Sequence, residues 1–142
     1  MLKIVVDTNV IVSALIKTQS NPALIVSLIF DTRVKFCLSD DIWDEYQGVL
    51  ARPKFQALDR GAVARILTGL KKKALWVKPK TKLLIIETDP EDNKFLEAAE
   101  EGRADFIVTG NTKHFPFKKF KKSQIVSPAE FLGIIAADIF KH

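Results

Sequence analysis

Residues Leu2–Asp7 read LKIVVD, an apolar run that ends in a carboxylate. Such a run is typical of a buried strand, and it places Asp7 at the strand's carboxyl end. Apolar runs at residues 36–38, 83–86 and 106–108 are each followed by polar or acidic residues. If these strands are parallel, their carboxyl ends lie at one edge of the sheet, where open α/β folds bind ligands. The sequence therefore predicts that carboxylates gather at that edge.

Strand patterns and helix patterns alternate along the chain. The expected strands cover residues 2–6, 34–38, 83–87, 105–109 and 124–127. The expected helices begin near Val10, at Asn21, after Ser39, after Asp59, at Asp89 and after Ser127. Gly102 is a good candidate for the left-handed turn that ends a helix. Apolar strands separated by helices predict an α/β protein with a mostly parallel, five-stranded sheet covered on both faces.

The composition suits one domain that spans residues 1–142. No apolar stretch approaches the roughly 20 residues of a membrane helix, and Asp7 interrupts the first run before a signal-peptide core forms. We therefore expect a cytoplasmic protein that does not bind membranes. The net charge of +5 favours a polyanionic partner, although solvated lysines explain it equally well. Cys37 lies in an apolar strand pattern and is expected to be a buried core residue.

Two further acids fall on apolar helical faces. Glu45 lies about 60° from Ile42 around its helix, whereas Asp44 falls on the opposite side. Asp92 heads the face that carries Phe95 and Leu96 by the same spacing. Both acids are therefore expected to face the sheet edge that carries Asp7.

Crowded inward carboxylates repel one another unless they share protons or bind a cation. A divalent ion resolves this conflict, and oxygen donors without histidine or cysteine favour Mg²⁺ or Mn²⁺. Such an ion generates a nucleophilic water and stabilises charge on phosphoryl oxygens. The alternative is that these residues are unrelated capping and surface acids; Asp89, for example, is explained as a helix cap.

At these residues the chain resembles the PIN-domain family, in particular the prokaryotic PIN proteins regarded as toxin components of toxin–antitoxin pairs. The resemblance covers nearly the whole chain. It rests on six segments in order: Ile4–Val10, Ser39–Leu50, Arg52–Phe55, Asp89–Leu96, Ala104–Asn111 and Ile125–Leu132.

The resemblance implies a three-layer α/β/α fold and a metal-dependent endoribonuclease that cleaves single-stranded RNA to a 3′-hydroxyl and a 5′-phosphate. It implies Asp7, Glu45 and Asp92 as ligands of Mg²⁺ or Mn²⁺, and a small antitoxin protein and a second copy of the chain as partners. Asn9 and Thr109 match positions that support the first ligand. The fourth acidic position falls on Asn111, whose neutral amide weakens a second metal site. Asp105 is an alternative source of that carboxylate, but it lies at the opposite end of its strand from Asn111 and is expected to be structural.

The segment after Asn111 is rich in lysines and phenylalanines. His114 is placed to contact a phosphate, or else is an ordinary loop residue. Phenylalanines at 115, 117 and 120 either stack bases or pack into the core. The candidate RNA-binding residues are Lys113, Lys118, Lys119, Lys121 and Lys122; a second basic group comprises Lys71, Lys72, Lys73, Lys78, Lys80 and Lys82.

Two other functions compete with a nuclease. A catalytically weak or silent RNA- or protein-binding domain on the same scaffold is favoured by Asn111, and metal-dependent cleavage separates the two. A phosphoacceptor receiver domain needs an acidic pair after its first strand and an acceptor aspartate after the third. Asp7 stands alone and the strand after it ends in Ser39, so this class ranks far behind.

Overall fold

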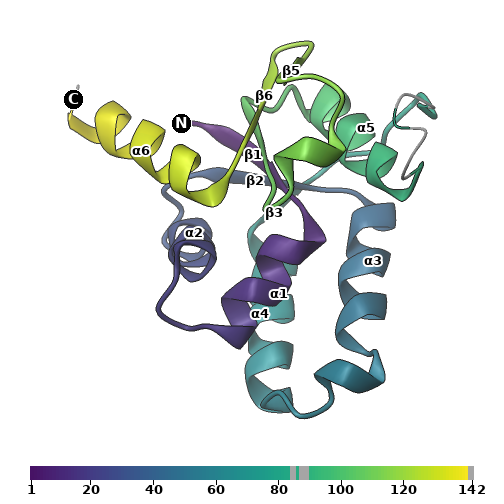
Figure 1. The fold of residues 1–142 in the computed structure, drawn as a ribbon, viewed down its shortest axis with the longest axis vertical. Coiled ribbons are helices and arrows are strands. Elements are labelled where there is room, and N and C mark those ends of the chain that lie inside the picture. The colour runs from purple at the N-terminus through teal and green to yellow at the C-terminus, as the bar shows by residue number, and fades with distance from the viewer. Residues whose placement is uncertain (84–85, 87–89, 141–142) are drawn as a thin grey trace.

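The computed structural model describes residues 1–83, 86 and 90–140 (Figure 1). Its described part contains one six-stranded sheet with the order β3-β2-β1-β4-β6-β5. The strands are β1 (Lys3–Val6), β2 (Lys35–Leu38), β3 (Ala74–Trp76), β4 (Phe106–Val108), β5 (Lys119–Phe120) and β6 (Ser123–Val126). All neighbours pair in parallel except β5, which is antiparallel to β6. The predicted mostly parallel α/β fold is confirmed, with six strands instead of five.

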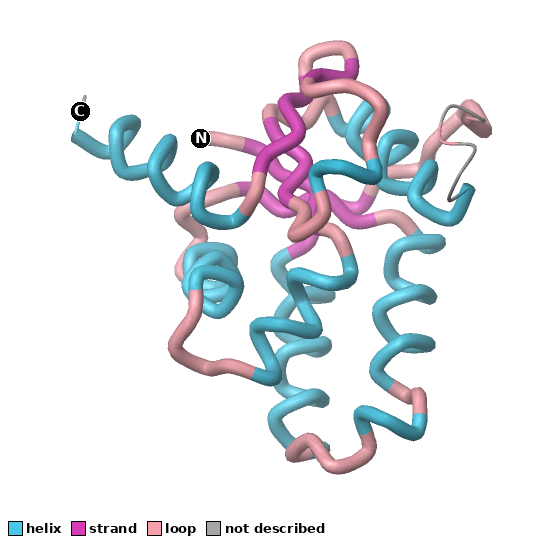
Figure 2. The backbone as a smooth tube through the Cα atoms, in the orientation of Figure 1, coloured by secondary structure: helices cyan, strands magenta, loops and turns pink. Residues whose placement is uncertain are grey.

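Helices flank this sheet. They are α1 (Thr8–Ile16), α2 (Asn21–Phe30), α3 (Asp40–Leu50), α4 (Arg60–Lys73), α5 (Asn93–Gly102) and α6 (Pro128–Phe140), with short 3₁₀ helices η1 (Pro53–Phe55), η2 (Pro90–Asp92) and η3 (Thr112–His114). In Figure 1, α1, α2 and α4 lie together below the strands, and α5 lies to their upper right. Figure 2 shows the strands gathered in one central group between these helices.

The apolar patterns that predicted the elements form the core. The side chains of Ile4, Val5 and Val6 in β1 and of all three β4 residues are almost completely buried, and so is Cys37 in β2, as expected. Two predicted helix starts are confirmed by capping bonds: Ser39 accepts from the Ile42 N–H at 3.3 Å, and Asp59 accepts from the Gly61 N–H at 2.9 Å. We expected Asn21 to cap α2, but the cap is Ser20 and Asn21 is the first helical residue.

The third strand differs from the prediction. We expected a strand at residues 83–87, but Leu83 and Ile86 are not in a strand, and residues 84–85 and 87–89, including the expected cap Asp89, lie outside the described residues. The strand beside β2 is instead Ala74–Trp76, which directly follows α4. This edge strand has three residues, two of them exposed, which is too short for a periodic pattern. From the sequence alone, these residues are therefore not distinguished from the end of the preceding helix.

The turn after α5 also differs by one residue. Arg103 has the left-handed conformation, with φ at 53°, whereas Gly102 lies in the helix. Gly102 is required for a different reason: a Cβ atom there would lie 2.9 Å from the Cys37 sulfur. The glycine allows α5 to approach β2 closely.

No single helix among the described residues has the length and apolar composition to cross a membrane, and α1 with α2 meets that test only as a pair bent by 103°.

Candidate active site

Asp7 follows β1 directly and occupies the N-cap position of α1. Its main-chain N–H donates to the carbonyl oxygen of Val108 at 2.9 Å, which continues the β1–β4 pairing past the last strand residue. Its side chain is almost fully buried. The Thr109 hydroxyl donates to Oδ2 of Asp7 at 2.7 Å, and Thr109 itself is completely buried. The neighbouring strand end therefore holds this carboxylate in place.

The environment of Asp7 disfavours its charge. Burial raises the pKa of the carboxyl group above its ordinary value, and the nearby Glu45 carboxylate raises it further. The Thr109 hydroxyl and the main-chain N–H groups of Asn9 and Thr8 act in the opposite direction and do not offset the burial. A cation bound between Asp7 and Glu45 would relieve the repulsion.

Tyr46 fixes the helix that carries Glu45. The Tyr46 ring is fully buried on the inner face of α3, and its hydroxyl donates to the carbonyl oxygen of Val6. That carbonyl immediately precedes Asp7, so the bond connects α3 to the strand end that carries the first acid. The Thr8 hydroxyl, one residue after Asp7, donates to Oε2 of Glu45. Glu45 is thereby brought to the start of α1, as its position on the helical face predicted.

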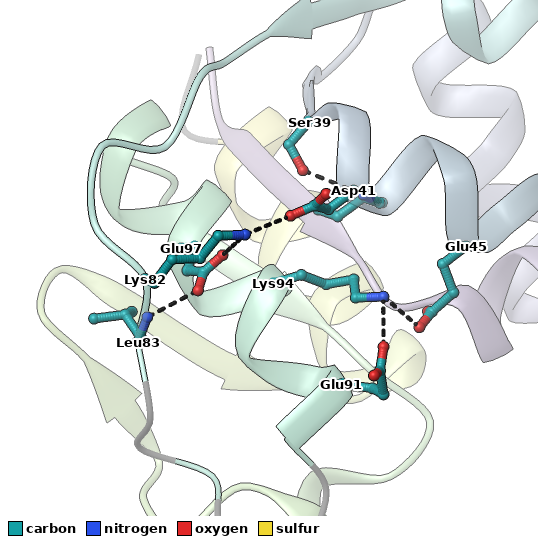
Figure 3. Close-up of polar contacts among 9 residues, drawn as sticks. Ser39, Asp41, Glu45, Lys82, Leu83, Glu91, Lys94 and Glu97 are labelled. Carbon is teal, nitrogen blue, oxygen red and sulfur yellow. Dashed lines mark hydrogen bonds and ion pairs between the residues drawn. The ribbon is translucent and has the colours of Figure 1, made fainter.

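A lysine ammonium occupies the other side of Glu45. Lys94 lies in the first turn of α5, and its Nζ donates to Oε1 of Glu45 at 3.0 Å and to Oε2 of Glu91 at 3.1 Å. Figure 3 shows Lys94 reaching across to the two glutamates. Burial lowers the pKa of Lys94, but the hydrogen bonds and charges of the two carboxylates outweigh it and leave the pKa raised.

Asp92 ends η2, and 14% of its side chain is exposed. His114 Nδ1 lies 3.8 Å from Oδ2 of Asp92, and His114 Nε2 lies 3.0 Å from Nδ2 of Asn111. The Asn111 main-chain N–H in turn donates to the Thr109 hydroxyl at 3.0 Å. The loop after β4 therefore links Asp92 to the residues that hold Asp7.

The donor chemistry fits a hard divalent cation, but the ligands are not assembled. Among the described residues, no three Asp, Glu, His or Cys side chains are grouped closely enough to hold a metal ion. Asp7 and Glu45 are neighbours, and one chain of contacts through His114, Asn111 and Thr109 connects Asp92 to Asp7. Metal binding therefore requires side-chain movement at Glu45, Asp92 or both.

A cavity of about 650 Å³ opens beside Glu45 and Lys94, between α3 and α5. The residue before Lys94 anchors its far wall: the Asn93 side chain accepts from the Ile86 N–H at 2.9 Å and donates to the Ile86 carbonyl at 3.1 Å. Glu97 accepts from the Leu83 N–H at 2.8 Å (Figure 3). These bonds tie residues 83 and 86 to α5 and hold the helix start in place.

The lysines predicted to bind RNA are distributed over two regions. Lys113 and Lys118 line a pocket of about 360 Å³ next to η3, together with Phe117. Lys121 and Lys122 instead form ion pairs with Glu100 at 2.6 Å and Asp105 at 3.3 Å, near the amino end of β4. Lys119 is exposed on β5.

The three phenylalanines of this segment divide in the same way. Phe115 and Phe120 are buried in the core. Phe117 is half-buried, stacks on Phe120 with ring centroids 5.6 Å apart, and lines the pocket. Core packing therefore explains Phe115 and Phe120, although Phe115 also contributes to the lining of that pocket, and Phe117 is the more exposed of the two rings that line it.

Sequence reasoning missed three residues at the site: Thr8, Tyr46 and Lys94. Tyr46 carried a signal, since a buried tyrosine hydroxyl needs a hydrogen-bond partner. Lys94 lies two residues after Asp92. Its position in the sequence does not indicate whether its side chain turns toward the site or remains in solvent. Asn9, predicted to support Asp7, has an exposed side chain and acts on Asp7 through its main-chain N–H.

A family model described as a PIN domain matches residues 3–113. The chain belongs to the PIN-domain family. This PIN domain is 32% identical over 112 residues to the uncharacterized protein MJ1680 of Methanocaldococcus jannaschii, across 78% of this chain and 71% of that protein. Its fold matches a chain of the DNA-bound VapBC structure from Salmonella typhimurium with a TM-score of 0.58 and 16% identity, over 90% of this chain and 99% of that one. PIN domains are generally nucleases, and they typically use divalent metal ions.

Proposed function

We propose that this PIN domain is an endoribonuclease that cleaves single-stranded RNA with Mg²⁺ or Mn²⁺ held by Asp7, Glu45 and Asp92. The observation that carries the proposal is the pair of neighbouring carboxylates at the carboxyl edge of the sheet, Asp7 and Glu45. Burial and mutual repulsion raise the pKa of Asp7, and a divalent ion is the partner that makes such a pair stable in its charged form.

Each neighbouring residue has a definable task in such a site. Thr109 orients Asp7, and Thr8 orients Glu45. His114 contacts Asp92, and Asn111 contacts His114, at the side where the loop after β4 begins. When bound, the metal would supply an activated water and stabilise charge on the phosphoryl oxygens.

Single-stranded RNA fits the surface next to this site. The loop that carries Asn111 and His114 continues into the pocket lined by Phe117, Lys113 and Lys118. An aromatic ring stacks on a base of any sequence, and flanking lysines neutralise phosphates. Lys113 and Lys118 are therefore better placed for RNA than Lys121 and Lys122, which are engaged in ion pairs.

The same proposal makes the protein the toxin component of a toxin–antitoxin pair, with a small antitoxin protein as partner and a second copy of the chain in a homo-oligomer. Support comes from the sequence resemblance and from the likeness in fold to a chain of a VapBC complex. The proposed location is the cytoplasm.

The alternative is a catalytically weak or silent PIN domain that binds RNA or protein. Two observations favour it: Asn111 is an amide where the family has an acid, and Lys94 engages an oxygen of Glu45. Cleavage measurements separate the two functions.

The test is Mn²⁺-supported cleavage of a labelled single-stranded RNA by the wild type and by Asp7→Asn, Glu45→Gln and Asp92→Asn. Each substitution removes one charge with little change of shape, and each is expected to lower the cleavage rate by at least about 100-fold. Asp31→Asn, which removes an exposed carboxylate at the end of α2, is the matched control and should cleave like the wild type. Circular dichroism checks the fold of every variant. Undiminished cleavage by two of the three site variants, or cleavage by the wild type without metal, would refute the assignment, and absent cleavage by the wild type would favour the alternative.

A further inference from the structure

Lys94 is not an ordinary surface lysine. Only 15% of its side chain is exposed, and 20% of the Glu45 side chain is exposed. By contrast, the ion pair between Lys82 and Asp41, also at 3.0 Å, has side chains that are 81% and 51% exposed. Exposed pairs contribute little because water screens them, whereas a pair withdrawn from water interacts much more strongly.

Both oxygens of Glu45 are occupied in this arrangement. The Thr8 hydroxyl takes Oε2, and the Lys94 ammonium takes Oε1. A hydroxyl accommodates a metal-bound carboxylate, since it only donates a hydrogen bond. The Lys94 ammonium, by contrast, places a positive charge 3.0 Å from Oε1 of Glu45. A divalent cation bound to the same carboxylate would be repelled by that charge, so the ammonium and the metal ion compete for Glu45.

Glu91 offers the ammonium a second position. It lies three residues before Lys94, it is 77% exposed, and its Oε2 is 3.1 Å from Nζ of Lys94. The start of α5 is fixed by the buried Asn93 bonds to Ile86, so a rotation of the Lys94 side chain, without movement of the helix, suffices to leave Glu45 and remain on Glu91.

We propose that Lys94 is an internal counter-cation that neutralises Glu45 in the metal-free protein, competes with the divalent ion for that carboxylate, and passes to Glu91 when the ion binds. Lys94 thus sets the metal affinity of the site and acts through Glu45 as a positioning residue. The inference rests on the proposed function only in taking Glu45 as a metal ligand.

Calorimetric titration with Mn²⁺ alone, at constant ionic strength and without RNA, tests the competition. Lys94→Met removes the charge but keeps a long apolar side chain, and it should tighten Mn²⁺ binding by about tenfold or more. Lys94→Arg keeps the charge and should bind Mn²⁺ within about threefold of the wild type. Lys82→Met is the matched control, because its charge lies on the same cavity but is solvated, and it should change the affinity by less than about twofold.

The transfer to Glu91 is tested by a double-mutant cycle. Glu91→Gln should weaken Mn²⁺ binding by severalfold when Lys94 is present. Of the two glutamates that Lys94 contacts, Glu45 is then the one that still carries a carboxylate, so the ammonium competes more strongly with the ion for it. In the Lys94→Met background the same change should have a clearly smaller effect. Equal effects in both backgrounds would show that Glu91 acts only through its general negative charge, and would refute the transfer.

The outcomes separate this inference from the proposed function. If the wild type binds Mn²⁺ and cleaves RNA but Lys94→Met binds Mn²⁺ no more tightly, the competition is refuted and the nuclease assignment stands. If Lys94→Met tightens binding and neither protein cleaves RNA, the competition stands and the nuclease assignment fails. Weaker binding by Lys94→Met would show that the lysine supports the metal site, the reverse of the proposal. Absence of Mn²⁺ binding by both proteins would overturn the competition and the metal site together.

Discussion

Thr109→Val tests the support of Asp7 most directly. The substitution keeps the branched shape at a completely buried position but removes the hydroxyl that donates to Asp7 at 2.7 Å and accepts from the Asn111 N–H at 3.0 Å. A hydrogen bond to a charged group contributes about 1.5 to 3 kcal/mol, and a neutral one about 0.5 to 1.5 kcal/mol. We therefore expect the free energy of unfolding at neutral pH to fall by roughly 2 to 4 kcal/mol.

The pH dependence of this loss identifies its cause. The bond to Asp7 favours the carboxylate form, so it stabilises the protein at pH values where Asp7 is charged and is lost as Asp7 becomes protonated. Burial already raises the pKa of Asp7 above its unfolded value, so the folded state becomes less stable as the pH rises through that window. Thr109→Val raises the pKa of Asp7 further and makes this decline larger. The difference from the wild type should therefore be largest at neutral pH and should shrink below the folded pKa of Asp7.

Urea unfolding at neutral and acidic pH measures both effects. Thr109→Ser is the control, because it keeps the hydroxyl and removes one buried methyl group, at a cost of about 1 kcal/mol that does not depend on pH. The reasoning is refuted if Thr109→Val is as stable as Thr109→Ser at neutral pH, or if its loss is the same at both pH values.

Three further changes have defined outcomes. Tyr46→Phe removes a buried hydroxyl that joins α3 to β1, so urea unfolding should show a loss of about 1 to 3 kcal/mol, and calorimetry should show weaker Mn²⁺ binding; a neutral effect on both would mean that the bond positions nothing. Asn111→Asp adds a carboxylate next to His114, which contacts Asp92, and should tighten Mn²⁺ binding or add a second ion, whereas unchanged calorimetry would place residue 111 outside the metal site. Gly69→Ala should lower the free energy of unfolding by about 1 to 3 kcal/mol, because a Cβ atom there would lie 2.7 Å from the Phe30 ring. Gly133→Ala is the control: a Cβ atom there would have no neighbour within 4 Å, and the change should raise the free energy of unfolding by up to about 1 kcal/mol. Similar effects of the two substitutions on urea unfolding would contradict the clash at Gly69.

The long, well-patterned elements were predictable because local sequence and tertiary burial agree in them. The apolar run Ile4–Val6 of β1 and the capped starts of α3 and α4 depend on nearest neighbours and on one buried face. The misplaced strand had no such agreement: residues 74–76 form an edge strand, and each of them pairs with a β2 residue 38 positions earlier in the chain. Pairing of that kind is decided by the packed sheet and not by the local pattern.

In the candidate site, too, the features set by local sequence were predictable and those set by tertiary packing were not. The placement of Asp7 and Glu45 followed from a strand end and a helical face, which are geometric consequences of the sequence. The engagement of Glu45 by Lys94 did not, because it depends on the distance between α3 and α5 across the molecule. Lysine patterns alone likewise failed to separate Lys118, at a pocket, from Lys122, in an ion pair with Asp105.

The balance of charge at this site favours a single divalent ion. As the proposed ligands, Asp7, Glu45 and Asp92 would offer three negative charges, and Asn111 adds none where the family has a fourth. The Lys94 ammonium, on Glu45 in the metal-free protein and on Glu91 once an ion is bound, adds a positive charge close by. A second divalent ion would therefore enter a site that the first ion has already brought close to neutrality, with no further carboxylate in the position where Asn111 contacts His114. Asn111→Asp and Lys94→Met each make the site more negative by one unit through different residues. If charge is what limits the site to one ion, combining them should favour a second ion more than either change alone.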